Sequence, residues 1–161
     1  MKRKNGKLDP FHLERFVEAQ FPVFERVRTE LAAGEKRSHW MWFIFPQIRG
    51  LGTSFMAQRF AISNLDEAGA YLRHPLLGPR LRNCTSLMNG QQGRSVGEIL
   101  GSPDDLKFHS SMTLFVQATA KHGLPGEAFQ QALTQFFDGV PDAATLDRLA
   151  SMKPASVALD E

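Results

Sequence analysis

Cysteine is the scarcest feature of this sequence, because Cys84 is the single one among 161 residues. One thiol cannot form an intramolecular disulfide and cannot supply a multi-cysteine zinc site within one chain. This composition favours a reducing compartment, so we expect a cytoplasmic protein. Cys84 stands at an apolar position of an expected helix, where a buried thiol behaves as a small hydrophobic side chain. We therefore interpret it as an inert core residue, since a nucleophilic cysteine needs an exposed and electropositive setting.

Long apolar runs and closely spaced histidines are also lacking. No stretch of about 18 apolar residues occurs, so the sequence predicts no membrane span and no membrane partner. Two histidines three or four residues apart would share a helix face and could hold a metal ion, but none of the five is so placed. These are His12, His39, His74, His109 and His122. The sequence therefore predicts no metal site, and no motif in it calls for a cofactor.

An excess of positive charge is found only at the start of the chain. The formal net charge is +2, and subtracting the four charges of Lys2, Arg3, Lys4 and Lys7 leaves −2 for the rest. We predict a disordered basic tail over residues 1–8, a single helical domain over 9–153 and a disordered tail over 154–161. Charge alone could bring the basic tail to RNA, DNA or acidic lipid, but a solubilising terminus is the commoner case. The sequence does not favour nucleic-acid binding, and it leaves the oligomeric state unknown.

Strand patterns are nearly absent, whereas helix signals recur along the chain. Hydrophobic residues make up 42% of the sequence, which is enough for one packed domain. Apolar residues at helical spacing follow capping residues or prolines, and glycines, among them Gly34, Gly101 and Gly123, close several of the segments. The expected helices begin near Asp9, Pro22, Asn64, Pro75, Ser95, Ser102, Leu124 and Asp142. We predict an all-α fold, either an irregular single-domain bundle or an α-α superhelix-like packing of about seven or eight helices. Residues 42–45 fit either a strand or a buried helical turn.

The segment 38–54 contains both tryptophans, and its one formal charge is Arg49 when histidine is neutral. Such an aromatic segment is expected to be buried, and burial obliges its polar groups to find hydrogen-bond partners. Those groups belong to His39, Trp40, Trp42 and Gln47. We favour internal pairing with neighbouring backbone carbonyls, and a bound ligand is the alternative.

Two glycines follow this aromatic block. Gly50 and Gly52 permit a close approach of the backbone just before Thr53 or Ser54 can cap a new helix. Exposed N–H groups beside Arg49 would suit a phosphate or a carboxylate. The segment lacks the third glycine of a dinucleotide fingerprint and the Gly-Lys-Ser/Thr ending of a P-loop. A glycine-rich turn with an ordinary cap is therefore the simpler interpretation.

The long helix expected from Ser102 carries a second polar cluster. Asp105 and His109 stand four residues apart, as do Lys107 and Ser111, so each pair shares a helix face. A histidine oriented by an aspartate beside Ser110 and Ser111 could serve acid–base or nucleophilic chemistry. However, acids in a first turn stabilise the helix dipole, and small serines often mark close helix packing. The catalytic residues therefore remain unknown.

Four segments taken together resemble a known family. They are 39–47 with the pattern His-Trp-x-Trp-x-x-Phe-Pro-Gln, 50–54, 71–81 and 105–115. They are similar to a bacterial family of unknown function, some of whose members carry the label calpastatin, over roughly residues 11–149. The resemblance implies a mainly helical fold and no established activity. We reject the label, because calpain inhibitors of that type bind as extended polar repeats, whereas this chain has the composition of a packed domain. Phe43, Phe108 and His109 depart from the family pattern, which weakens the case for an Asp105–His109 pair.

Two functions compete at this point. The first is a soluble helical domain with a pocket for a small polar or anionic ligand, formed where the aromatic block packs against the long helix. The candidate ligand-binding residues are His39, Trp40, Trp42, Gln47, Arg49, Gly50, Gly52, Ser54, Lys107, Ser110 and Ser111. The second is a helical protein–protein interaction module without catalysis, because thirteen phenylalanines leave room for an aromatic surface.

Overall fold

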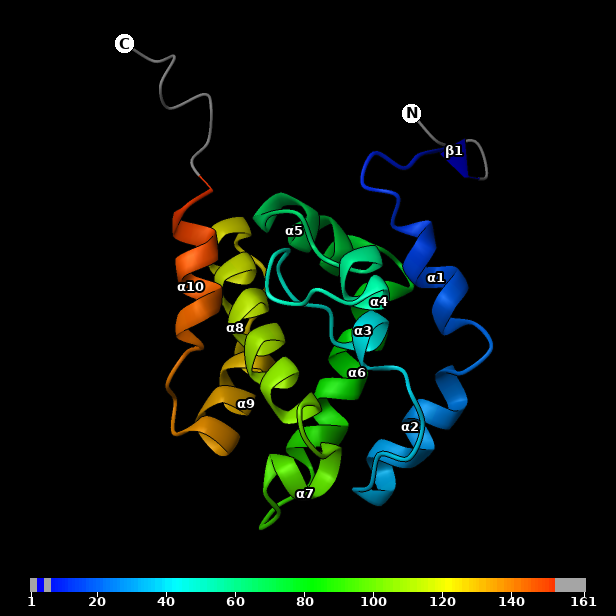
Figure 1. The fold of residues 1–161 in the computed structure, drawn as a ribbon. Helices are drawn as coiled ribbons and strands as arrows, with labels where there is room; N and C mark the ends of the chain where they lie inside the picture. The colour runs from blue at the N-terminus through cyan, green and yellow to red at the C-terminus, as the bar shows by residue number, and fades with distance from the viewer. Residues whose placement is uncertain (1–2, 5–6, 153–161) are drawn as a thin grey trace.

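The computed structural model describes residues 3–4 and 7–152, and these form ten α-helices and one two-stranded hairpin (Figure 1). The helices are α1 (Glu14–Gln20), α2 (Phe24–Ala33), α3 (Met41–Ile44), α4 (Phe55–Arg59), α5 (Leu65–Arg73), α6 (Leu77–Asn89), α7 (Val96–Leu100), α8 (Asp104–His122), α9 (Glu127–Phe137) and α10 (Ala143–Ala150). The predicted all-α class is confirmed. The predicted number of seven or eight helices is too low for the part of the chain that is described.

The two additional helices, α3 and α4, are short and lie within or just after the aromatic block. Helix α3 has four residues. It contains most of residues 42–45, whose sequence fitted either a strand or a buried helical turn. Helix α4 has five residues, and the Ser54 hydroxyl caps it by accepting the N–H of Ala57 at 3.1 Å. One turn of helix contains too few residues to establish a period of 3.6, so periodicity could not detect either element.

Most of the other helix ends lie at the capping residues that the sequence predicts. The side chains of Asn64 and Asp142 accept backbone N–H groups at the starts of α5 and α10, and Ser95 forms a complete capping box at α7. Gly34 and Gly123 close α2 and α8 in the left-handed conformation that glycine adopts without strain.

Two predicted starts differ from the structure. Helix α8 begins after Pro103 without a side-chain cap, so Ser102 does not have the capping role that its position suggested. The Asp9 carboxylate does accept N–H groups, from Leu13 at 2.7 Å and Glu14 at 3.0 Å. Helix α1 nevertheless begins only at Glu14, because a turn precedes it.

Helix α8 lies at the centre of the fold and packs against α5, α7, α9 and α10. In Figure 1 it is the long yellow-green helix between α10 and the rest of the molecule. All six residues from 110 to 115 are buried, so this part of the helix has no solvent-facing side. A helix buried all round needs apolar or small polar side chains on every face, which explains its serines and threonines.

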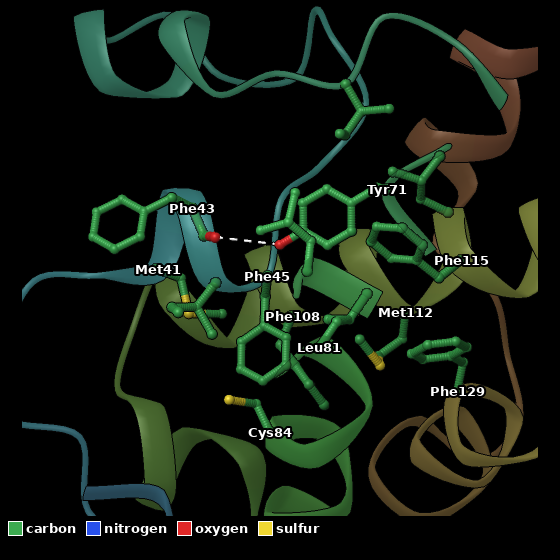
Figure 2. Close-up of a cluster of buried hydrophobic side chains, with 14 of the residues drawn as sticks. Met41, Phe43, Phe45, Tyr71, Leu81, Cys84, Phe108, Met112, Phe115 and Phe129 are labelled. Carbon is green, nitrogen blue, oxygen red and sulfur yellow. Dashed lines mark hydrogen bonds between the residues drawn. The ribbon is translucent and has the colours of Figure 1, made fainter. Parts of the chain in front are cut away.

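Aromatic side chains connect α8 to the aromatic block and to its neighbouring helices (Figure 2). The ring of Phe45 meets that of Phe108 at 4.9 Å between centroids, in the edge-to-face geometry that aromatic pairs prefer. Farther along α8, the Phe115 ring lies 5.7 Å from the rings of both Tyr71 in α5 and Phe129 in α9. The aromatic block therefore folds inward against the long helix, as expected.

The basic start of the chain contains a short hairpin. Strand β1 (Arg3–Lys4) pairs antiparallel with β2 (Lys7–Leu8), within the segment 1–8 that we predicted to be a disordered tail. Residues 1–2, 5–6 and 153–161 lie outside the described residues, and so does the predicted tail over 154–161. Within residues 3–4 and 7–152, no helix is both long enough and apolar enough to cross a membrane.

Candidate functional site

Trp40 has an internal hydrogen-bond partner. Its indole Nε1 donates to the Glu30 carboxylate in α2 at 2.8 Å, and the ring is buried. Glu30 also accepts the N–H groups of Arg37 and Ser38 and, at 2.7 Å, the Ser38 hydroxyl. Burial raises the pKa of Glu30, but these four donors outweigh it and lower the pKa to about 2. An internal hydrogen bond thus satisfies the indole N–H of Trp40. Its acceptor is a carboxylate ten residues earlier in the chain, and not the backbone carbonyl of a neighbouring residue.

The two tryptophan rings each lie beside a lysine that pairs with Asp104. The Lys36 ammonium is 5.0 Å from the centre of the Trp40 ring and 2.9 Å from Asp104 Oδ2. The Lys107 ammonium is 5.4 Å from the centre of the Trp42 ring and 3.7 Å from Asp104 Oδ1. Trp42 and Lys107 are therefore neighbours, as the predicted site requires, and cation–π and ionic contacts already engage them.

The two predicted serines of α8 differ in their surroundings. Ser110 is buried and its hydroxyl donates to the carbonyl of Leu106 at 3.0 Å, one turn earlier. Ser111 is completely buried, and its hydroxyl has no hydrogen-bond partner among the described residues. The serines therefore lie inside the helix packing around α8.

His109 does not pair with Asp105. Its Nε2 lies 2.7 Å from the carbonyl oxygen of Val140, and its Nδ1 lies 3.9 Å from Asp142. Asp105 instead accepts the N–H of Leu106 at 2.8 Å. The pair considered from the sequence is therefore wrong, and His109 connects α8 to the segment before α10.

The loop after the aromatic block is held by backbone hydrogen bonds and by an arginine. The N–H of Ile62 donates to the Gln47 carbonyl at 2.9 Å, and the N–H of Arg49 donates to the Ile62 carbonyl at 2.8 Å. Arg148 of α10 donates to the Arg49 carbonyl at 3.2 Å. Gly50 has a φ of 101°, and a Cβ there would lie only 2.4 Å from the Arg148 guanidinium. The positive φ thus favours glycine at this position, whereas the guanidinium is the end of a flexible side chain and would have to shift to make room for a Cβ.

The remaining predicted residues belong to the same stretch of chain. A Cβ on Gly52 would lie 2.6 Å from the Ala57 Cβ, so glycine lets the loop approach α4 closely. Ser54 uses its hydroxyl as the cap of α4, and His39 is exposed at the start of the aromatic block. A glycine-rich turn with an ordinary cap describes the local structure, and whether any of these residues holds a ligand stays a prediction.

A cleft of about 690 Å³ opens beside this loop. Its walls come from the segment that leads into α1, from α4 and from the start of α5. It is lined by Pro10, Phe11, His12, Arg15, Arg49, Phe55, Gln58, Arg59, Ser63 and Glu67. Among these described residues, Arg49 is the one that the sequence analysis had selected.

A buried arginine fixes the walls of the cleft. The Arg15 guanidinium donates to the Glu67 carboxylate at 2.9 Å and to four backbone carbonyls. The carbonyls are those of Phe11 at 2.7 Å, His12 at 2.9 Å, Arg59 at 2.8 Å and Ala61 at 2.9 Å. Glu67 also accepts the N–H and the hydroxyl of Ser63, at 2.9 and 2.7 Å. One network thus joins all three walls.

The cleft has an excess of positive charge. The charges of Arg15 and Glu67 offset each other, whereas Arg49 and Arg59 form no ion pair with any described residue. On α4, Phe55, Gln58 and Arg59 stand at the spacing of one helix face. This arrangement suits a small anion that also carries an apolar or hydrogen-bonding part.

Most residues of the cleft were not selected from the sequence. Phe55, Gln58 and Arg59 have the spacing of one helix face. This spacing would place them together if a helix were predicted to follow the cap at Ser54. For Arg15 and Glu67 the local sequence contains no such signal, because charged residues on amphipathic helices normally face solvent.

The comparisons with known proteins place the chain in a family. Residues 10–149 match the family described as "Protein of unknown function (DUF1810)". The chain belongs to this family. Its fold is similar to the crystal structure of the conserved hypothetical protein Rv1873 from Mycobacterium tuberculosis, with a TM-score of 0.84 and 56% sequence identity over 88% of this chain and 99% of that one. No curated protein matches this DUF1810 chain. The resemblance to a family of unknown function is thereby confirmed.

Proposed function

We propose that this protein is a cytoplasmic helical protein that binds a small organic anion in the cleft between α1, α4 and α5. The observation that carries the proposal is the pair Arg49 and Arg59, which line the cleft and form no ion pair with the described residues. Two guanidinium groups without acidic partners make a cleft that attracts negative charge. A guanidinium binds phosphate or carboxylate through two parallel hydrogen bonds.

The size and construction of the cleft support the same proposal. A volume of about 690 Å³ lies within the range of roughly 300–1,000 Å³ that is usual for small-molecule sites. The hydrogen bonds of Arg15 fix the backbone around Phe11 and Arg59, so two walls are formed before any ligand arrives. Walls that need no ordering on binding reduce the entropic cost of association.

From the residues selected by sequence, the proposal retains Arg49 together with the loop that positions it. Gly50 permits the close contact with Arg148 that holds this loop to α10. Trp40 takes no part, because its indole N–H already donates to Glu30.

The test is a thermal-shift and calorimetry series with inorganic phosphate, citrate and a sugar phosphate as probes. An anion at about 100 times its dissociation constant stabilises the folded protein by about 2.7 kcal/mol. We expect the double variant Arg49→Gln, Arg59→Gln to lose this stabilisation. The matched control is Arg26→Gln, which removes an exposed arginine from α2.

Equal binding by the double variant and the control would refute the proposal, as would a lack of binding by every probe. Size-exclusion chromatography of the same samples tests the alternative of a protein-interaction module, which predicts self-association or capture of a partner without any anion effect.

A further inference from the structure

Phe55 is an exposed aromatic residue at the edge of the proposed anion site. Its side chain is 75% accessible to solvent although it lines the cleft, and it makes no ring contact with the described aromatic residues. Exposing a large apolar side chain gains nothing for folding, because the hydrophobic effect favours its burial. An exposed ring beside two arginines that form no ion pair with the described residues offers a surface on which a planar group can stack.

The same face of α4 places this ring one turn from a cation. Residues four apart on a helix are neighbours, so Phe55 and Arg59 border one region of the cleft. Arg49 approaches the cleft from the loop held by Arg148. A ligand with a planar ring at one end and a doubly charged anionic group at the other matches this arrangement.

Two hydrogen-bond acceptors complete the lining. Gln58 donates through its Nε2 to the carbonyl of Thr53 at 2.6 Å, which leaves its amide oxygen to accept. The Ser63 hydroxyl donates to Glu67 and retains lone pairs of its own. Acceptors in a cationic cleft suit a ligand that carries hydroxyl or amino donors as well as an anion.

We infer that the ligand of this cleft is a mononucleotide, with its base stacked on Phe55 and its phosphate held by Arg49 and Arg59. This inference rests on the proposed function, since it identifies the anion as a nucleotide phosphate. A single nucleotide fits better than a nucleic-acid strand, because the two arginines of the cleft can neutralise one phosphate group but cannot follow a series of them.

The experiment is isothermal titration calorimetry with adenosine 5′-monophosphate, ribose 5-phosphate and inorganic phosphate. We expect the nucleotide to bind about tenfold more tightly than ribose 5-phosphate, since stacking on an aromatic ring contributes about 5- to 150-fold per base. Phe55→Ala should remove about this factor for the nucleotide and leave ribose 5-phosphate unchanged, whereas Phe55→Trp should retain it. Phe21→Ala is the matched control, because Phe21 is equally exposed and lies at the end of α1.

The outcomes separate the two proposals. If ribose 5-phosphate binds as tightly as the nucleotide and Phe55→Ala has no effect, the inference is wrong and the proposed anion site stands. If none of the three probes binds, both fail. If a short single-stranded RNA binds more than tenfold more tightly than the nucleotide, with a steep salt dependence, the site binds a nucleic-acid strand and the inference is overturned.

Discussion

Replacing Glu30 by glutamine tests how much stability depends on the hydrogen bonds that hold the aromatic block to α2. The Glu30 carboxylate accepts four hydrogen bonds, and its pKa falls from 4.5 to about 2 in the folded protein. At about 1.4 kcal/mol for each pKa unit, this difference corresponds to about 3 kcal/mol of stability. Glutamine has a similar shape but carries no charge, so we expect it to lose about 2–3 kcal/mol at pH 7.

The dependence on pH distinguishes this effect from a simple packing defect. A depressed carboxylate pKa contributes its full stability above pH 4.5, and this contribution is lost as the pH falls from 4.5 toward 2. The free energies of unfolding of the wild type and of Glu30→Gln should therefore differ at pH 7 and approach each other near pH 2. Urea denaturation followed by circular dichroism at several pH values measures both.

The control is Glu25→Gln on the same helix, where the carboxyl is largely exposed and pairs with Arg28. We expect this substitution to cost less than about 1 kcal/mol, as is usual for a surface ion pair. A constant difference between the wild type and Glu30→Gln across the whole pH range would refute the reasoning.

Two further predictions concern a backbone position and the lone thiol. Gly50→Ala should lower the free energy of unfolding by about 1–2 kcal/mol, since a positive φ is combined with displacement of the Arg148 guanidinium, which donates to the Arg49 carbonyl. Gly93→Ala, with a positive φ but open space, should cost only about 1 kcal/mol; equal losses in chemical denaturation would show that the Arg148 contact does not matter. Cys84 is fully buried, and burial raises its pKa to about 12, so a thiol reagent should label it only in denaturant. Rapid labelling of the native protein would contradict this.

Helix positions were predictable wherever the determining interaction is local. The cap of α5 at Asn64 and the left-handed end of α8 at Gly123 depend on residues within one turn, and both were assigned correctly. Helix α3 was not predicted, because its four residues, of which Met41, Phe43 and Ile44 are buried, satisfy the pattern of a strand and of a helix equally. Local sequence thus determines most helix ends, and it leaves the shortest elements open.

The burial of individual phenylalanines likewise cannot be predicted from local sequence. Phe108 is completely buried in the centre of the fold, whereas Phe55 is exposed at the cleft, although both are aromatic residues in the first half of a helix. What separates them is the tertiary contacts around each, such as the ring of Phe45 against Phe108. An aromatic residue that belongs to a binding surface therefore cannot be told from a core residue by type alone.

The cleft itself depends on interactions between distant segments. Arg15 donates to carbonyls that stand 44 and 46 residues later in the chain, and no local pattern marks either partner. A charged residue on a helix is normally interpreted as solvent-facing, because burying a charge is costly unless it is paired and hydrogen-bonded. The five hydrogen bonds of Arg15 meet that requirement only after α1, α4 and α5 have come together. Because the same contacts form the walls, the site and the tertiary fold arise together, and sequence could indicate the loop around Arg49 but not the cleft beside it.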